Sequence, residues 1–311
     1  MKISIVIATR NSEKTITKCL SSMMPDKDAG LIDEIIVIDG QSNDKTREIV
    51  QKYPVRLLDD IGNGVFSAFD TAWRKTKAEW IVFIDSDAYI ENGFIPGLTT
   101  FFVDERIGIL GCRAKGCGTG IIGKAINQWW EYHGDSLKIK KNKTPSNWKR
   151  LYYLVTGYSK SEQPNTSGPC YAVRRQCLEQ VNGFSNWTFL YDKYPRLLYP
   201  GDIFLSQDVI DAGWMSRWWV DAPVFHHPPE KTRELLRQRI GWGQGDRELL
   251  RVMDAPIYKR LFPLIVRLGA PIWGAWFAFI YRNPVHIVLF PLAHFSWIIG
   301  FIGNKDKIET K

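Results

Sequence analysis

The stretch EWIVFIDSD at residues 79–87 decides the fold class. Its apolar run WIVFI contains no polar residue, which is typical of a parallel strand that is covered on both faces. Similar runs occur earlier in the chain, with helical patterns between them: ISIVIA (3–8), EIIVID (34–39) and the shorter VRLL (55–58). Strands that alternate with helices predict an α/β fold with a mostly parallel central sheet flanked by helices.

Two more strands are predicted at IGILGC (107–112) and GPCYAVRR (168–175), the second followed by a helix over 176–182. Residues 113–165 mix glycine, lysine and aromatic residues without a helical or strand period. We therefore expect an insertion there, or a lid over the sheet.

The composition bounds the class of protein. The chain has 311 residues, of which 45% are apolar, so it is neither disordered nor fibrous. Its net charge of +8 indicates an anionic partner: nucleic acid, a membrane surface or a phosphorylated substrate. No nucleic-acid-binding signature accompanies the charge. Five scattered cysteines without a CxxC pair argue against zinc and for reduced thiols in the cytosol, and the N-terminal apolar run is too short for a signal peptide.

Acidic residues follow the predicted strands at their carboxyl ends, where ligands bind in such sheets. Asp39 ends the second strand, Asp59 and Asp60 follow the third, and Asp85 and Asp87 follow the fourth. Two carboxylates separated by one residue can both reach one small volume. Oxygen ligands of this kind suit Mg²⁺ or Mn²⁺, which would neutralise a departing diphosphate.

Several segments together resemble the inverting family 2 glycosyltransferases, which have the GT-A fold. The donor side matches in order and spacing over residues 1–90, in the runs SIVIATRN, EIIVIDGQSNDKT, GNGVFSAFDTA and EWIVFIDSD. The resemblance continues less tightly to about residue 250, in SGPCYAVRRQCLEQVNGF (167–184), GDIFLSQDVIDAGW (201–214) and FHHPPEKTRELLRQRIGWGQG (225–245).

The resemblance implies a nucleotide-sugar site and a metal site. The nucleotide-sugar-binding residues that it implies are Thr9, Asn11, Asp39, Ser42, Asp60 (or Asp59), Asp85 and Arg239. The metal ligands that it implies are Asp85, Asp87, His226 and His227, with either histidine or both completing the site. Asp44 lies in the same loop as Ser42, but is a good N-cap for the next helix.

Asp202 is the expected catalytic base, because a carboxylate can remove the proton of an attacking acceptor hydroxyl. The family usually carries Glu immediately before this Asp, and this chain has Gly201 instead, so Asp208 and Asp192 are kept as alternatives. A second departure is Phe69, where several family members have Arg.

The end of the chain has another composition. Residues 261–281 and 285–302 are apolar and rich in tryptophan, and each is about long enough to span a bilayer, the second marginally. Interfacial or re-entrant helices and a Trp-rich core subdomain are alternatives. Residues 251–311 carry a net +5 and residues 138–150 a net +6, so the rest of the chain is slightly acidic. The basic excess therefore favours an anionic membrane surface over nucleic acid.

These observations predict three parts: a nucleotide-sugar-binding half (1–112), an acceptor-binding half with the basic insertion (113–250) and an apolar, membrane-associating helical tail (251–311). The expected function is metal-dependent, inverting sugar transfer to a polyprenyl-linked or polysaccharide acceptor at the cytoplasmic membrane face. One alternative is a nucleotidyltransferase, although ATRNSEKT (8–15) lacks the glycines of such enzymes. The other is a non-catalytic scaffold that retains the fold, which Gly201 and Phe69 make conceivable.

Overall fold

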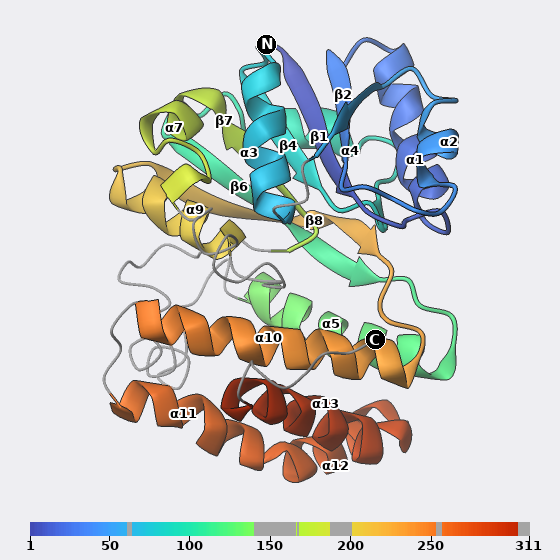
Figure 1. The fold of residues 1–311 in the computed structure, drawn as a ribbon, viewed down its shortest axis with the longest axis vertical. Coiled ribbons are helices and arrows are strands. Elements are labelled where there is room, and N and C mark those ends of the chain that lie inside the picture. The colour runs from blue at the N-terminus through green and yellow to red at the C-terminus, as the bar shows by residue number, and fades with distance from the viewer. Residues whose placement is uncertain (61–63, 140–165, 167, 187–200, 253–256, 304–311) are drawn as a thin grey trace.

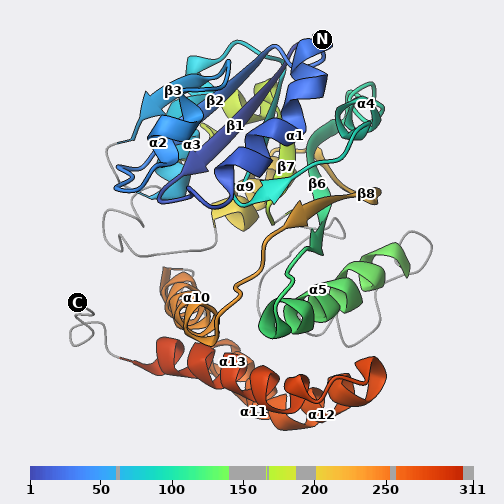
Figure 2. The same cartoon turned by 90° about the vertical axis from the view of Figure 1, so that its right-hand side faces the viewer.

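The computed structural model describes residues 1–60, 64–139, 166, 168–186, 201–252 and 257–303. They form two stacked parts, which Figures 1 and 2 show from two sides. The first part is an eight-stranded sheet with helices on its faces. The second is a layer of helices beneath the carboxyl ends of the first strands, and we call it the helical layer: α5 (Ile121–Ile139), α10 (Thr232–Val252), α11 (Ile257–Leu268), α12 (Ala270–Tyr281) and α13 (Val285–Ile302).

The sheet has the strand order β3-β2-β1-β4-β7-β6-β8-β5. Its first four strands are parallel, as the apolar runs predict: β1 (Ile3–Thr9), β2 (Glu34–Asp39), β3 (Arg56–Asp59) and β4 (Trp80–Ile84). The helices that connect them are α1 (Ile16–Asp28), α2 (Thr46–Val50) and α3 (Val65–Lys75). The register aligns Thr9 with Asp39 and Asp39 with Asp59, so three strand ends meet at one edge.

The other half of the sheet is mixed. β7 (Cys170–Arg174) is antiparallel to both of its neighbours, β4 and β6 (Ile107–Gly116). β8 (Met215–His226) is parallel to β6, and the two-residue strand β5 (Ala88–Tyr89) pairs antiparallel with the end of β8. The remaining described helices are α4 (Phe94–Thr99), α7 (Arg175–Gln180) and α9 (Gly201–Asp211). The predicted α/β fold is therefore confirmed, with a mixed half beyond the parallel one.

Both faces of the sheet are covered, which explains the unbroken apolar runs. Alternate residues of β1 point to opposite faces, so Ile5 packs in one core and Val6 in the other. Phe69 belongs to the second core, where its ring centroid lies 4.9 Å from that of Phe83 and its side chain is buried. The departure from Arg at this position is thus a packing feature of the core.

The described part of the predicted insertion, residues 113–139, contains the end of β6 and the helix α5, and residues 140–165 lie outside the described residues. β6 continues four residues beyond the expected strand, to Gly116, and α5 then packs against α13 beneath the sheet (Figure 2). The Glu230 carboxylate accepts the backbone N–H groups of Thr119 and Gly120, at 2.8 and 3.0 Å, just before α5 begins. This contact ties the segment after β8 to the start of α5. Most of the basic run 138–150 lies outside the described residues.

The apolar tail packs against α10 by close contact at two glycines. A Cβ at Gly243 would lie 2.0 Å from the Trp297 carbonyl oxygen, and one at Gly300 would lie 2.0 Å from that of Ile240. Only glycine allows the two helix backbones to approach this closely.

The structure divides the first apolar run in two. Among the described residues, α13 is the one helix that is both long enough and apolar enough to cross a membrane. Its mean hydropathy is 1.9, and 44% of its residues are buried. The run 261–281 passes the same test only as a pair of helices bent by 47° at Gly269. By length, α13 is therefore the better candidate for a membrane-spanning helix, although the sequence predicted residues 285–302 to be only marginally long enough.

Candidate active site

A pocket of about 470 Å³ opens at the carboxyl ends of β1 and β4. The loop after β1 forms one wall and the DSD turn after β4 forms the other. Its lining residues are Ala8, Arg10, Asn11, Ser12, Lys14, Thr15, Asp85, Ser86 and Asp87. The Ser12 and Ser86 hydroxyls lie 2.9 Å apart and join the two walls. The Thr9 hydroxyl is buried, lies outside the pocket lining and has no hydrogen-bond partner among the described residues.

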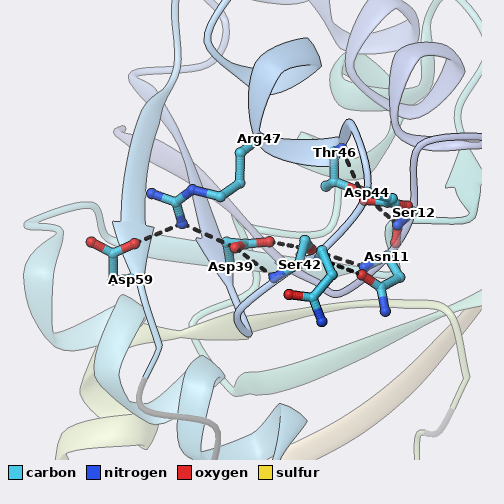
Figure 3. A network of polar contacts seen from close by, with 9 residues as sticks. Asn11, Ser12, Asp39, Ser42, Asp44, Thr46, Arg47 and Asp59 are labelled. Carbon is cyan, nitrogen blue, oxygen red and sulfur yellow. Dashed lines mark hydrogen bonds and ion pairs between the residues drawn. The ribbon is translucent and has the colours of Figure 1, made fainter.

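Asp39 is buried at the end of β2 and is held by three donors (Figure 3). The Ser42 hydroxyl and N–H donate to its two oxygens at 2.5 and 3.1 Å, and Arg47 donates to it at 2.9 Å. Arg47 also pairs with Asp59 at 2.6 Å. A carboxylate has about four acceptor positions, and these donors occupy three of them, which holds the Asp39 side chain in its fully buried position.

The loop after β1 and the loop after β2 are joined by reciprocal hydrogen bonds. The Asn11 N–H donates to Ser42 Oγ at 2.9 Å, and the Asn11 side chain accepts the N–H of Asn43 at 2.8 Å. Asn11 adopts a φ of 52°, which Asn tolerates better than most residues. Asp44 accepts the Thr46 N–H at 2.9 Å and the Glu13 N–H at 3.1 Å, but the N-cap position of α2 is Lys45, so Asp44 lies one residue before the predicted capping position. Asp60 is buried, and its N–H donates to the Asp39 carbonyl at 2.9 Å.

Asp85, Asp87 and His226 form the candidate metal centre. His226 Nε2 lies 3.0 Å from Asp87 Oδ1 and 4.0 Å from Asp85 Oδ2, and one ligand atom from each residue lies within 4.8 Å of the others. The pairing of β5 with β8 brings the three together, because it sets Ala88 opposite His226. Two carboxylates and an imidazole form a donor set that fits Mn²⁺ or Mg²⁺.

The charges of the three groups are coupled. Burial and the Asp87 carboxylate raise the pKa of Asp85 to about 7. Burial alone would lower the pKa of His226, but Asp87 and then Asp85 outweigh it and raise that pKa. Two nearby carboxylates repel each other, and a cation between them reduces this repulsion. Protonated His226 is that cation in the absence of metal, and a divalent ion would take its place when bound.

The structure separates the two histidines. The His227 N–H donates to the Asp87 carbonyl at 3.0 Å, but the His227 ring faces Tyr89, with centroids 5.9 Å apart. Among the described residues, His227 is not part of the cluster. The His226 ring stacks on Trp130 of α5 at 5.0 Å, so the helical layer supports the candidate metal centre.

Asp202 lies in the first turn of α9, close enough to Asp85 for its charge to raise the pKa of Asp85. Its carboxylate accepts the N–H of Gly168 at 3.0 Å and of Ile203 at 2.9 Å. Burial raises the pKa of Asp202 to about 6, and these hydrogen bonds oppose the rise. Gly201 is explained by packing, because a Cβ there would lie 2.5 Å from the Phe66 ring.

The alternative bases are less well supported. Asp208 lies six residues after Asp202 on the same helix, so it points about 240° away around the helix axis. Asp192 lies outside the described residues.

Arg239 is not at the pocket. It is buried in α10, with its guanidinium 4.5 Å from the Trp129 ring centroid and 4.2 Å from that of Trp242. The predicted role at the donor site therefore has no support from the geometry of the described residues.

Three basic residues near the site were missed by the sequence reasoning. Arg10 and Lys14 line the pocket, and Arg47 joins Asp39 to Asp59. Two cations directly after the first strand, in ATRNSEK, are a signal for a diphosphate site that could have been used. Arg47 gave no such signal, since an Arg on a short helix is usually a solvated residue.

An α/β sheet with two carboxylates and an imidazole beside a pocket at its edge is the arrangement of a metal-dependent enzyme. Residues 4–181 match the family model described as "Glycosyl transferase family 2", and the chain belongs to this family of glycosyltransferases. This membership decides against the nucleotidyltransferase and scaffold alternatives.

Two relatives illustrate the range of the family. The poly(ribitol-phosphate) beta-N-acetylglucosaminyltransferase TarS of Staphylococcus aureus is 30% identical over 128 residues, which cover 39% of this chain and 22% of TarS. The chain thus matches about a fifth of that relative. Glycosyltransferase AglE of Haloferax volcanii is 22% identical over 269 residues, covering 84% of this chain and 78% of AglE.

Solved structures confirm the GT-A type of fold. Glucosyl-3-phosphoglycerate synthase from Mycobacterium tuberculosis, in complex with Mn²⁺, UDP and phosphoglyceric acid, superposes with a TM-score of 0.53 at 21% identity, covering 80% of this chain and 78% of its own. Mannosyltransferase PcManGT from Pyrobaculum calidifontis, in complex with GDP-Man and Mn²⁺, gives a TM-score of 0.57 at 15% identity, covering 98% and 88%.

Proposed function

We propose that this protein transfers a sugar, with inversion, from a nucleotide-sugar to a polyprenyl-linked or polysaccharide acceptor at the cytoplasmic face of a membrane. The observation that carries the proposal is the cluster of Asp85, Asp87 and His226 at one side of the 470 Å³ pocket, with Asp202 close by. A base, a divalent-cation site and a donor pocket are thus collected at one edge of the sheet.

On this proposal the donor occupies the pocket. Its base and ribose lie at the ends of β1 and β2, near Thr9 and Asp39, whose buried oxygens would become accessible when the donor binds. Asn11, Ser42 and Asp60 shape the loops around the base. The Arg10 and Lys14 side chains attract the diphosphate.

Asp85, Asp87 and His226 would hold the divalent cation. When bound, Mn²⁺ or Mg²⁺ supplies electrostatic stabilisation of the departing nucleoside diphosphate. The protein residues set the charge balance, since two carboxylates and a neutral imidazole leave a site of charge −2.

Asp202 then acts as the base. Its carboxylate takes the proton of the acceptor hydroxyl while that oxygen bonds to the anomeric carbon. The bond from the anomeric carbon to the diphosphate oxygen breaks in the same displacement, so the configuration inverts. The hydrogen bonds from Gly168 and Ile203 fix the carboxylate, and burial keeps its basicity above that of an exposed Asp.

The acceptor and its location rest on the helical layer. α11, α12 and α13 expose large apolar side chains, among them Ile272, Trp273, Trp276, Phe279, Val288 and Phe295. Residues 257–303 contain four basic residues and no acidic one, which suits an anionic lipid surface. All five cysteines are free, as expected of a cytoplasmic protein. TarS carries poly(ribitol-phosphate) in its name, which supports a polymer acceptor here.

We further propose that residues 1–112 form the donor half, residues 113–250 the acceptor half and residues 251–311 the membrane-associating tail. The pocket and the DSD turn lie in the first of these, and Asp202 in the second.

The test is release of nucleoside diphosphate from a panel of sugar donors, with lipid extracts as acceptors, with and without Mn²⁺. Wild-type protein is expected to release it only with metal and acceptor, and Asp202→Asn to lose transfer while it retains donor binding. Full transfer by Asp202→Asn would show that Asp202 is not the base. Absence of metal-linked binding of any nucleoside diphosphate would refute the proposed function.

A further inference from the structure

The helical layer contains a buried cation that has no counter-charge among the residues that the structure describes. Arg239 of α10 is 8% exposed and lies between the rings of Trp129 and Trp242. Among the described residues, no carboxylate lies within ion-pair distance of it, and its Nε has no hydrogen-bond partner. Its planar guanidinium stays charged at neutral pH and offers a fork of donors that fits phosphate oxygens.

A second cation makes this burial more costly. Arg267 of α11 lies near Arg239, and burial together with this neighbour lowers the pKa of Arg239 to about 9. Arg267 itself has partners: His294 Nδ1 at 3.1 Å, Asp246 at 3.9 Å and the Trp297 ring at 3.9 Å. Contact with two tryptophans offsets part of the cost for Arg239, but an isolated buried charge is a feature that proteins avoid. An anionic ligand would remove the imbalance.

The anion is not the donor diphosphate. None of the pocket-lining residues belongs to α10, and none of them contacts Arg239. The Arg239 guanidinium lies against Trp129, next in sequence to Trp130, whose ring stacks on His226. Arg239 and His226 therefore contact neighbouring residues of α5, Arg239 from α10 and His226 from the sheet.

An apolar groove lies between three helices of the helical layer, α5, α10 and α13. It has a volume of about 270 Å³ and is lined by Ile122, Thr232, Val285, Val288, Leu289 and Leu292. Thr232 lies seven residues before Arg239 on α10, so the two share one face of the helix about 10 Å apart. Val288 and Leu292 also belong to the exposed apolar surface of α13. The groove thus offers hydrocarbon contact, continuous with the proposed membrane face, two turns from a buried cation.

We propose that Arg239 binds the phosphate group of a lipid phosphate acceptor whose hydrocarbon chain lies in this groove. This inference rests on the proposed function and gives its acceptor a chemical class. Arg239 acts as an acceptor-binding residue, and the tryptophan rings hold its guanidinium in place. A soluble phosphate ester would use the same cation but not the groove.

The experiment is calorimetric titration of the full chain with farnesyl phosphate, farnesol and glycerol phosphate, and separately with nucleoside diphosphates and Mn²⁺. Arg239→Gln is compared with Arg237→Gln, since Arg237 is exposed on the same helix. Wild type is expected to bind farnesyl phosphate at least about tenfold more tightly than either other ligand. Arg239→Gln is expected to lose about 10- to 100-fold in that affinity, the effect of removing charge-assisted hydrogen bonds, and Arg237→Gln to lose less than about twofold.

The nucleotide arm separates this inference from the proposed function. The affinity of Arg239→Gln for nucleoside diphosphates should equal that of wild type. If this affinity is lost while farnesyl phosphate binding stays intact, the inference is wrong and Arg239 belongs to the donor-binding site. Equal affinity of wild type for glycerol phosphate would overturn the assignment of the groove. If Arg239→Gln does not fold, Arg239→Lys decides, because Lys keeps the charge without the paired donors. It should bind farnesyl phosphate about three- to tenfold more weakly, and wild-type affinity would overturn the proposal.

Discussion

Gly201 precedes the proposed base, and its lack of a side chain is required by one ring. A Cβ added there would lie 2.5 Å from two atoms of the Phe66 ring and 2.8 Å from a third. Phe66 is itself buried, with the Phe184 and Phe69 rings at 5.5 and 6.0 Å, so moving its ring would disturb both contacts. Gly201→Ala should therefore displace the first turn of α9 and, with it, Asp202.

The magnitude follows from two opposing effects. Overpacking a core costs about 1–3 kcal/mol, and replacing Gly by Ala in a helix gains at most about 1 kcal/mol. Gly201→Ala should lower the free energy of unfolding by about 1–2 kcal/mol. Because a displacement of about 1 Å can reduce catalysis on the order of 100-fold, transfer activity should fall further than stability does.

The assay is urea unfolding together with donor turnover, in a double-mutant cycle with Phe66→Ala. Ala removes Cγ and both Cδ atoms, which are the Phe66 atoms nearest Gly201, so Gly201→Ala should cost less stability and activity in the Phe66→Ala background than in wild type. A coupling free energy of at least about 1 kcal/mol is expected for groups in direct contact. Additive effects of the two substitutions, or a Gly201→Ala variant as stable and active as wild type, would refute this account of the glycine.

Three further predictions concern the base, the link between the two parts and the tail. Because transfer needs ionised Asp202, whose pKa burial raises to about 6, kcat/KM should fall tenfold per pH unit below about pH 6 and level off above it. Glu230→Ala removes the acceptor of two N–H groups before α5 and should cost about 1 kcal/mol in urea unfolding. Ile272→Glu with Phe279→Glu places two charges on the most exposed part of α12 and should weaken binding to anionic liposomes at least about tenfold in sedimentation.

Each of these predictions has a control and a contrary outcome. A pH profile without an acid limb near 6 would argue against Asp202 as the base. Glu131→Ala, on the exposed side of α5, should leave the free energy of unfolding unchanged. If Glu131→Ala lowers it as much as Glu230→Ala does, the Glu230 contact is not the cause of the loss. Val103→Glu is the matched control for liposomes, since Val103 is 81% exposed in the sheet part; an equal effect there would remove the membrane interpretation of the tail.

The fold was predictable where the signal is local. Four runs rich in apolar residues became four parallel strands, because strands that are covered on both faces are mostly apolar; β3, at the edge of the sheet, is only partly buried. The antiparallel β7 was found as a strand, but its direction depends on partners that lie 60 to 90 residues away in sequence. The direction of pairing is set by packing, which a single strand does not encode.

The candidate site was predictable in its composition and less so in its geometry. Asp85 and Asp87 follow a strand, so their proximity was foreseeable, but the choice of His226 over His227 depends on the register of Ala88 with His226. Neighbouring residues on a strand point to opposite sides, so a shift of one residue would exchange the two histidines. Arg239 was misplaced because helix periodicity does not tell which neighbour a face meets.

The most direct measurement of the central claim is calorimetric titration of Mn²⁺ together with a nucleoside diphosphate into wild type, His226→Ala and His227→Ala. The structure predicts that His226→Ala weakens metal-linked binding at least about tenfold, as expected for loss of a ligand, and that His227→Ala stays within about twofold of wild type. Equal affinities of all three proteins, or a larger loss in His227→Ala, would contradict the claim that Asp85, Asp87 and His226 form the metal centre of this glycosyltransferase.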